Sequence, residues 1–327
     1  MLTRIGNLSM ARLQSIGALV LMVVALSVTT HTFLTPDNGW NILRQISVNL
    51  CLSIGMTLII LTGGIDLSVG AVLGLAGAMA AGLLKAGLSI PALGIHLEFT
   101  VVGAVLAGIG VGAVLGACNG LAITRLRLPP FVATLAMLSI ARGLALLWTG
   151  GFPITGLNPS FEFLGTGSWL GVPMPVWEVG LLAIATAVTC THTVFGRHIY
   201  AVGGSERAAR LSGVSVNKIK CAVYAIGGAL SGISGLIVTA RLDSAQPNAG
   251  LGYELDSIAA VVIGGASLSG GNGSITGTVL GCLIIGVLNN GLFLLDVSPF
   301  WQQVIKGLVI LTAVALDRVG QRHTHAA

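Results

Sequence analysis

The chain has 327 residues, of which 54% are hydrophobic, 8% are charged and 47 are glycine, and its formal net charge at pH 7 is +5. Soluble domains carry about 25% charged residues, so this composition excludes a soluble globular fold as well as a disordered chain, and it predicts an inner-membrane protein. In such a protein Lys and Arg mark cytoplasmic loops, so the positive charge does not indicate a nucleic-acid partner.

A helix that crosses a bilayer needs about 20 mainly apolar residues. This criterion predicts an all-α polytopic membrane protein, a single transmembrane domain over residues 1–327. About ten spans are expected, at 14–34, 43–62, 65–84, 99–123, 131–149, 176–195, 221–240, 256–272, 275–295 and 302–317. The apolar run in the first span has basic residues before it, as in a signal peptide, but no small-x-small cleavage site follows it. We therefore interpret it as the first transmembrane helix.

The basic residues orient the predicted spans. Placing the N-terminus inside assigns 11 of the 16 Lys and Arg residues to cytoplasmic segments: Arg4, Arg12, Arg125, Arg127, Arg197, Arg207, Arg210, Lys218, Lys220, Arg318 and Arg322. This bias fits the positive-inside rule. With ten spans, both termini are expected in the cytoplasm.

Two short motifs recur in the same order along the chain. Residues 64–68 (Gly-Ile-Asp-Leu-Ser) are echoed by residues 252–256 (Gly-Tyr-Glu-Leu-Asp), and Asn-Gly-Leu at 119–121 is echoed at 290–292, each with a Pro-Phe pair following. The two copies face opposite sides of the membrane in the predicted topology. This pattern predicts an inverted internal repeat, as in many transport folds; the alternative is chance similarity within a Gly-rich chain.

The longest predicted cytoplasmic segment, residues 196–220, carries five basic residues together with His198 and Glu206. Ser205 is a suitable N-cap for a short helix that continues to Leu211, and Gly213 is suited to end it. Such a helix is suited to docking a soluble partner. On spacing alone, an ordinary solvated basic loop is the alternative.

Residues 206–213 (Glu-Arg-Ala-Ala-Arg-Leu-Ser-Gly) resemble the E-x-A-A-x-x-x-G coupling loop of ABC importer permeases. The stretches 46–49, 55–58, 64–70, 196–204, 244–256, 258–265 and 288–292 resemble the ribose-type monosaccharide permeases of bacterial ABC importers. The resemblance runs from about residue 40 to residue 318. It implies an ATPase-coupling role for Glu206, Arg207, Ala208, Ala209, Arg210 and Gly213.

The resemblance also implies a complex in the bacterial inner membrane. Its parts are two copies of this permease, a cytoplasmic ATPase with two nucleotide-binding domains, and a periplasmic sugar-binding protein. Ribose or a similar monosaccharide, such as allose, is expected to cross at the dimer interface by alternating access. The sequence agrees with a separate ATPase subunit, because none of its four Lys residues stands in a G-x-x-x-x-G-K-[ST] phosphate loop. We therefore expect no enzyme activity and no cofactor, and the scattered His and Cys residues predict no metal site.

Several polar residues lie within or at the ends of predicted spans, where a charge costs about 2.5–3.5 kcal/mol. Candidates for translocation or hinge roles are Asp66, Asn119, Arg142, Glu254 and Asn290. We expect Asp66 and Glu254 to cap or hinge the interrupted third and eighth spans, with direct sugar contact as the alternative. Arg142 is expected to pair with a carboxylate or a carbonyl in the bundle rather than with the substrate.

A different class of protein fits part of this pattern. An inverted repeat, interrupted helices and embedded carboxylates also suit a secondary sugar transporter coupled to protons or sodium. The segment 196–220 separates the two hypotheses, because a carrier that works alone needs no docking helix.

Overall fold

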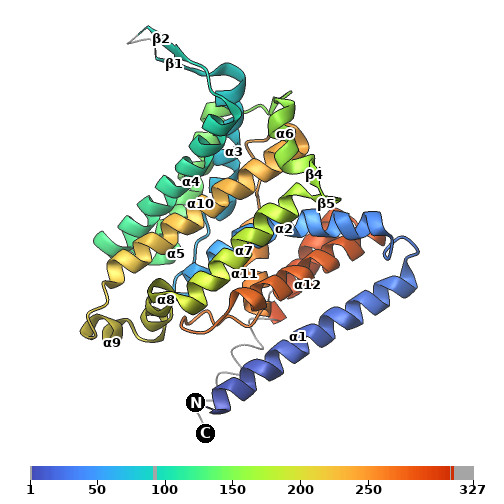
Figure 1. Cartoon of the computed structure of the whole chain (residues 1–327), viewed down its shortest axis with the longest axis vertical. Helices are drawn as coiled ribbons and strands as arrows, with labels where there is room; N and C mark the ends of the chain where they lie inside the picture. The colour runs from blue at the N-terminus through green and yellow to red at the C-terminus, as the bar shows by residue number, and fades with distance from the viewer. Residues whose placement is uncertain (1, 91–93, 310, 313–327) are drawn as a thin grey trace.

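The computed structural model describes residues 2–90, 94–309 and 311–312, and it is predominantly helical (Figure 1). Its long helices are α1 (Leu2–Thr29), α2 (Pro36–Leu61), α3 (Val69–Ala86), α4 (Val101–Arg125), α5 (Pro130–Thr149), α7 (Met174–His192), α10 (Val216–Leu242) and α12 (Ile275–Leu294). Shorter helices are α6 (Pro159–Thr166), α8 (Val194–Gly204), α9 (Glu206–Leu211) and α11 (Tyr253–Ile263). A further helical stretch covers residues 299–309.

Seven helices in the described part of the chain are long and apolar enough to cross a membrane: α2, α3, α4, α5, α7, α10 and α12. In α1, the described apolar part is the shorter stretch Ser15–Thr29. These helices confirm the predicted all-α polytopic membrane fold. They do not amount to the ten spans expected from hydropathy.

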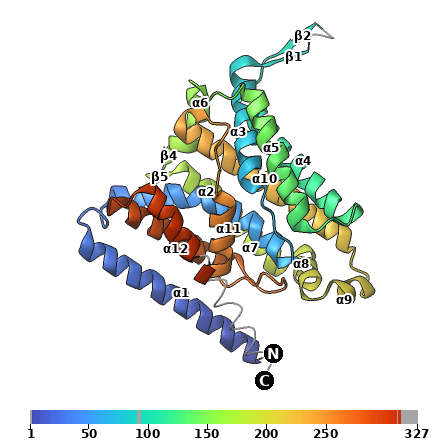
Figure 2. The same ribbon diagram turned by 180° about the vertical axis from the view of Figure 1, so that it is seen from behind.

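Three two-stranded antiparallel pairs join the helix ends. Strand β1 (Leu88–Ile90) pairs with β2 (Ile95–Leu97), β3 (Ile154–Thr155) with β6 (Ser244–Ala245), and β4 (Ser168–Trp169) with β5 (Val172–Pro173). The β1–β2 hairpin projects from one end of the bundle, whereas α8 and α9 lie at the opposite end (Figure 2). The β3–β6 pair ties the connection after α5 to the connection after α10.

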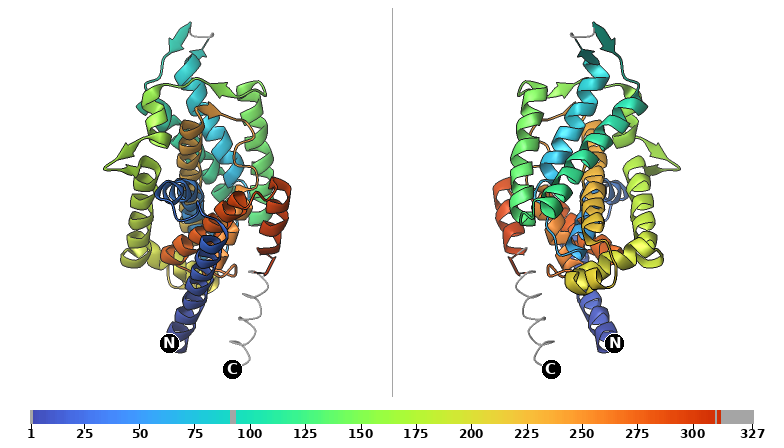
Figure 3. Two further views of the ribbon diagram at one scale, coloured as in Figure 1. Left: turned by 90° about the vertical axis from the view of Figure 1, so that its right-hand side faces the viewer. Right: turned by 90° about the vertical axis from the view of Figure 1, so that its left-hand side faces the viewer.

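The centre of the bundle consists of α2, α3 and α10. In the most apolar 18-residue stretch of each of these helices, 67%, 78% and 67% of the residues are buried. The corresponding fractions for α4, α5 and α7 are only 22–28%. Helices α4 and α10 approach closely at Gly112 and Gly228, where a Cβ on either residue would overlap the carbonyl oxygen of the other. Small residues allow such contacts between helices in a membrane. The outer helices surround this centre in the two side views (Figure 3).

The eighth predicted span, 256–272, is not a continuous helix, which agrees with the interruption expected there. Helix α11 covers only 11 residues, which is about 16 Å at 1.5 Å per residue and half the thickness of the hydrocarbon core. Beyond it, Gly265, Gly270 and Gly271 adopt positive φ angles of 87°, 86° and 73°. These left-handed conformations turn the chain into a loop that continues to Ser274, although its composition is apolar enough to resemble a span.

Other boundaries shift because local capping signals outweigh hydropathy. Helix α2 begins seven residues before the predicted start, at Pro36, where the side chain of Thr35 accepts a hydrogen bond from Asn38 N. Helix α10 begins at Val216 rather than at residue 221, so much of the segment 196–220 is helical instead of an open loop. Of the last predicted span, 302–317, residues 310 and 313–317 lie outside the described residues.

Candidate coupling segment and polar sites of the bundle

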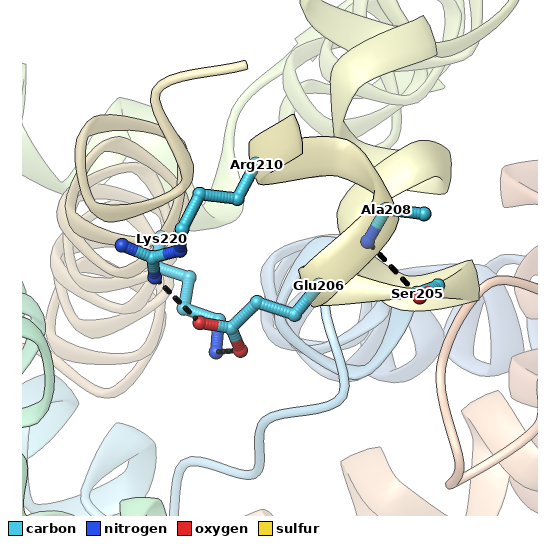
Figure 4. Close-up of polar contacts among 5 residues, drawn as sticks. All are labelled: Ser205, Glu206, Ala208, Arg210 and Lys220. Atoms are coloured by element: carbon cyan, nitrogen blue, oxygen red, sulfur yellow. Dashed lines mark hydrogen bonds and ion pairs between the residues drawn. The ribbon is translucent and has the colours of Figure 1, made fainter. Parts of the chain in front are cut away.

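Helix α9 forms where the sequence places a short cytoplasmic helix. The Ser205 hydroxyl accepts a hydrogen bond from Ala208 N at 3.2 Å, which confirms the predicted N-cap (Figure 4). Gly213 follows the helix with a φ of 84°, as expected for a glycine that ends a helix. Ser215 stands at the N-cap position of α10, but its side chain makes no capping hydrogen bond. Residues 205–215 therefore form a short connection between α8 and α10 that contains the helix α9.

Glu206 ties α9 to the start of α10. Its carboxylate accepts hydrogen bonds from Arg210 Nη2 at 3.0 Å and from Lys220 Nζ at 2.6 Å, so it lies between the two cations (Figure 4). The hydrogen bond from Lys220, with a smaller contribution from Arg210, holds the pKa of this carboxyl below its usual range. Arg207 is exposed, and Arg210 forms an ion pair with Glu206. The predicted coupling residues therefore form a charged surface in which part of the charge is neutralised.

The other face of α9 is packed inward. Ala209 is buried with Val202 of α8 and Val216 of α10 in a small apolar cluster. Ala208 is exposed, and Leu211, three residues further on, is 82% exposed. An exposed leucine beside an exposed alanine on one helical face is suited to contact with another protein.

Helix α8 connects this end of the chain to the bundle. The Tyr200 hydroxyl donates to Gly273 O at 3.0 Å, within the loop between α11 and α12. A Cβ on Gly203 would overlap Leu61 O and Gly271 N, and Gly271 N itself donates to Leu61 O at 3.0 Å. The segment around α9 therefore contacts both the end of α2 and the loop that precedes α12.

Asp66 lies in the break between α2 and α3 and is 2% exposed. Its Oδ1 accepts from Ser68 N at 2.8 Å and from Ser68 Oγ at 2.6 Å. Asn119 Nδ2, from α4, donates to the same Ser68 hydroxyl at 3.0 Å. Asp66 and Asn119 therefore belong to one network, which fixes the backbone where the helix is interrupted.

Arg142 meets backbone carbonyls, one of the two kinds of partner expected for it. Its Nη1 donates to Pro247 O at 2.6 Å and to Ala249 O at 2.9 Å. Both acceptors lie in the connection between α10 and α11, where no helix supplies partners for the backbone. The guanidinium of α5 therefore holds the second interrupted region in place, as Asp66 holds the first.

Glu254 and Asn290 have different surroundings. Glu254 lies in the first turn of α11, with its Oε2 beside Gly70 of α3, where a Cβ would overlap the backbone oxygen of Gly250. Asn290 of α12 is buried and exchanges two amide hydrogen bonds with Asn38 of α2, at 3.0 and 2.8 Å. Arg142 and Glu254 both lie beside the connection between α10 and α11 and the first turns of α3. The five candidate polar residues therefore occupy three places: Asp66 with Asn119, Arg142 with Glu254, and Asn290.

Another polar site was missed by the list of candidate residues. Asp256 of α11 forms an ion pair with Lys306 at 3.0 Å, and both side chains line a cavity together with Gln45, Arg241 and Asn289. The sequence held a signal for it, because Asp256 and Lys306 carry opposite charges within two predicted spans. Nothing in the sequence indicated that these positions, 50 residues apart, would meet.

Membrane-length helices around a buried centre, with a short polar helix at one end, define a polytopic membrane protein. Residues 39–314 match the family described as the permease component of the branched-chain amino acid transport system, and the chain belongs to this family. It is therefore a multi-pass membrane subunit of a transport system.

The chain is 46% identical over 312 residues to the ribose import permease protein RbsC of Escherichia coli (strain K12), an alignment that covers 94% of each protein. It is 49% identical over 311 residues to RbsC of Bacillus subtilis (strain 168), covering 94% of this chain and 93% of that protein. The D-allose transport system permease protein AlsC of Escherichia coli (strain K12) is 38% identical over 300 residues, or 92% of this chain and 89% of its own. No solved structure matches the chain.

Proposed function

We propose that this chain is the membrane-spanning subunit of an ATP-driven importer that moves ribose into the cytoplasm by alternating access. The observation that carries the substrate is the 46–49% identity to ribose import permeases over almost the whole chain. The D-allose permease is less similar, at 38%, so allose and other monosaccharides are the second choice. ATP hydrolysis is assigned to a separate partner chain.

The coupling role belongs to the segment 196–220. Glu206, Arg207, Ala208, Ala209, Arg210 and Gly213 match the coupling pattern, and α9 presents Ala208 and Leu211 on an exposed face. Tyr200 and Gly203 link the segment to the end of α2 and to the loop before α12. A push on α9 by the ATPase would therefore reach the helices of the bundle through α8.

The assembly follows from this role. Two copies of the permease would associate with a cytoplasmic ATPase that has two nucleotide-binding domains and with a periplasmic sugar-binding protein. We place the chain in the bacterial inner membrane as one domain with about ten spans and both termini in the cytoplasm. The position of α9 opposite the β1–β2 hairpin supports the cytoplasmic assignment of α9 (Figure 1).

The packing of the helices supports an inverted repeat. Helix α4 packs along α10, and its counterpart α12 packs along α2, while α3 contacts α4 as α11 contacts α12. Each copy of the repeat has a break after its first long helix, at residues 62–68 and 243–252. In this arrangement Asp66 with Asn119 and Arg142 with Glu254 act at the two hinges, and Asn290 joins the two copies through Asn38.

The test is reconstitution of the permease in nanodiscs with its candidate ATPase, with ATP hydrolysis measured as ribose-loaded or allose-loaded binding protein is added. We expect stimulation by the ribose-loaded protein that is lost when Glu206 and Arg210 are both replaced by Ala. The control is Arg197→Ala, which removes an exposed cation from α8 of the same segment. If only the allose-loaded protein stimulated ATP hydrolysis, the substrate would be allose rather than ribose. Sugar uptake that follows an ion gradient without ATP would contradict the proposal in favour of a secondary transporter.

A further inference from the structure

A basic pocket lies at the end of the bundle that carries α9, between the connection from α4 to α5 and the start of α10 (Figure 2). Its volume is about 610 Å³. A single buried water molecule needs roughly 10–15 Å³, so the pocket has room for a group of many heavy atoms. The charged part of its lining consists of Arg125, Arg127, Glu206, Arg210 and Lys220.

The pocket holds four cations and one carboxylate. Glu206 already binds two of the cations, Arg210 at 3.0 Å and Lys220 at 2.6 Å. Arg125 and Arg127 form no ion pair with any residue in the described part of the chain. The lining also includes a residue of the first turn of α10, and the N-terminus of a helix carries a partial positive charge. The pocket is therefore strongly positive and suited to an anion from outside the chain.

The pocket lies at the depth of the lipid headgroups. Helix α4 ends at Arg125 and α5 begins at Pro130, and both helices are long and apolar enough to cross a membrane. The residues that join them therefore lie at the membrane surface. Beside the lining residues in the sequence, the apolar side chains of Leu126, Phe131 and Val132 are at least half exposed. A ligand that joins an anionic group to hydrocarbon chains would satisfy both surfaces.

The pocket is separate from the surface of α9 that we assign to the ATPase. Glu206 and Arg210, four residues apart on the same helical face, line the pocket. Ala209 is buried against α8 and α10. The exposed residues Ala208 and Leu211 do not line the pocket. A ligand in the pocket and a protein on α9 can therefore be bound at the same time.

We propose that this pocket binds the phosphate group of an anionic glycerophospholipid of the cytoplasmic leaflet, with its acyl chains lying against α4 and α5. Arg125 and Arg127 donate to the phosphate oxygens, because a guanidinium presents its N–H groups in a planar fork that matches phosphate. Basic pockets on the cytoplasmic side of membrane proteins attract acidic headgroups in this way. The exposed apolar side chains favour a lipid over free inorganic phosphate. The choice of leaflet rests on the proposed orientation, whereas the binding itself does not.

The first measurement is native mass spectrometry of the full chain in detergent micelles, with bound lipids counted as dioleoyl phosphatidylglycerol or dioleoyl phosphatidylethanolamine is added. Phosphatidylglycerol, which is anionic, should bind more tightly than the zwitterionic lipid with the same chains. Each cation changes the affinity for an acidic lipid about fivefold, so the double variant Arg125→Gln with Arg127→Gln should bind phosphatidylglycerol about 25-fold more weakly. The matched control is Arg197→Gln, which removes an exposed cation from α8 at the same end of the molecule and should leave the affinity near the wild-type value.

A single variant keeps the inference testable if the double variant does not fold. Arg127 has a φ of 57°, a left-handed conformation that glycine adopts without steric cost. Arg127→Gly should therefore unfold, in the absence of added lipid, at a temperature no lower than the wild type. Its binding of phosphatidylglycerol should still be weakened about fivefold.

Three results would overturn the lipid site. The first is equal affinity for the two lipids, or wild-type binding of phosphatidylglycerol by both the double variant and Arg127→Gly. The second is displacement of the lipid by inorganic phosphate but not by chloride at the same ionic strength, which would make free phosphate the ligand. The third is loss of the complex with the ATPase in the double variant while its binding of phosphatidylglycerol is unchanged, which would make the pocket part of the docking surface.

Discussion

The hydroxyl of Tyr200 in α8 donates a hydrogen bond to the carbonyl oxygen of Gly273, 3.0 Å away and 73 residues further along the chain. Gly273 stands one residue before Ser274, the N-cap of α12, and its φ of 152° departs from any helical conformation. The same loop touches the end of α2 through Gly271. The bond therefore connects the exposed helix α9, through α8, to the start of a helix that lines the polar cavity.

Tyr200→Phe should weaken coupling more than it weakens folding. The substitution removes one hydrogen bond, worth about 1 kcal/mol net, and keeps the ring in place. We expect about a fivefold decrease in ribose moved per ATP hydrolysed. The control is Trp148→Phe, which removes a bond of 3.0 Å to Ala78 O within the bundle and should lower the thermal unfolding temperature without uncoupling transport. Equal effects of the two variants on the transport ratio would contradict the link through α8.

Two adjacent glycines at the end of α8 offer a sharper comparison. A Cβ on Gly203 would overlap Leu61 O and Gly271 N, whereas a Cβ on Gly204 would meet no atom within 4 Å. Gly203→Ala should therefore force α8 away from α2, at a cost of about 1–3 kcal/mol. Gly204→Ala should stay within about 0.5 kcal/mol of the wild type. The measurement is the unfolding temperature in detergent together with the yield of the complex with the ATPase; equal behaviour of the two variants would refute the close contact.

Local signals predicted more of this molecule than long-range ones. The short helix α9 was predicted because its N-cap Ser205 and its terminal Gly213 lie next to it in the sequence. The apolar runs of α2 to α5, α7, α10 and α12 predicted helices for the same reason. In contrast, α11 ends at residue 263, and several of the glycines that follow adopt left-handed conformations. The presence of a glycine in the sequence does not reveal the sign of its φ angle, because glycine adopts both.

The polar sites show the same limit. The sequence placed Arg142 inside a span and so predicted that it needed a partner, but its acceptors, Pro247 and Ala249, are more than 100 residues away. Asp256 and Lys306 meet only because α11 and the last described helix pack side by side. Which buried polar groups pair is decided by tertiary packing, which hydropathy and capping patterns do not encode.

The amide pair of Asn38 and Asn290 should behave as one unit. Each side chain donates to the other, and Asn38 Nδ2 also donates to Phe33 O at 2.9 Å. Either single substitution by Ala leaves a buried amide unsatisfied, at a cost of about 1–3 kcal/mol, and Asn38→Ala should cost more than Asn290→Ala. The double variant should be more stable than the sum of the single effects implies, by about 0.6–1.7 kcal/mol. Unfolding free energies of the four proteins in detergent test this, and strict additivity would show that the pair does not form.

The ion pairs of Glu206 should stay formed throughout the physiological pH range. Lys220 and Arg210 hold its pKa below the usual range, so the folded-state pKa lies below the unfolded value of about 4.3. Stabilisation by the carboxylate is therefore fully present above that unfolded value and is lost only as the pH falls through the folded pKa. The carboxylate is thus charged at neutral pH, with each exposed pair worth about 0.2–1 kcal/mol.

Glu206→Gln should accordingly reduce the stimulation of ATP hydrolysis by the same factor at every pH between about 6 and 8. The factor should shrink in high salt, because screening weakens the exposed pairs of the wild type. The control is Glu162→Gln, which replaces a half-buried glutamate in α6 at the far end of the bundle and should have no effect. If wild-type stimulation declined between pH 8 and pH 6 while that of Glu206→Gln stayed constant, the carboxylate would be titrating in that range. The two cations would then not be holding Glu206 ionised, and α9 would not be fixed to α10 by charge.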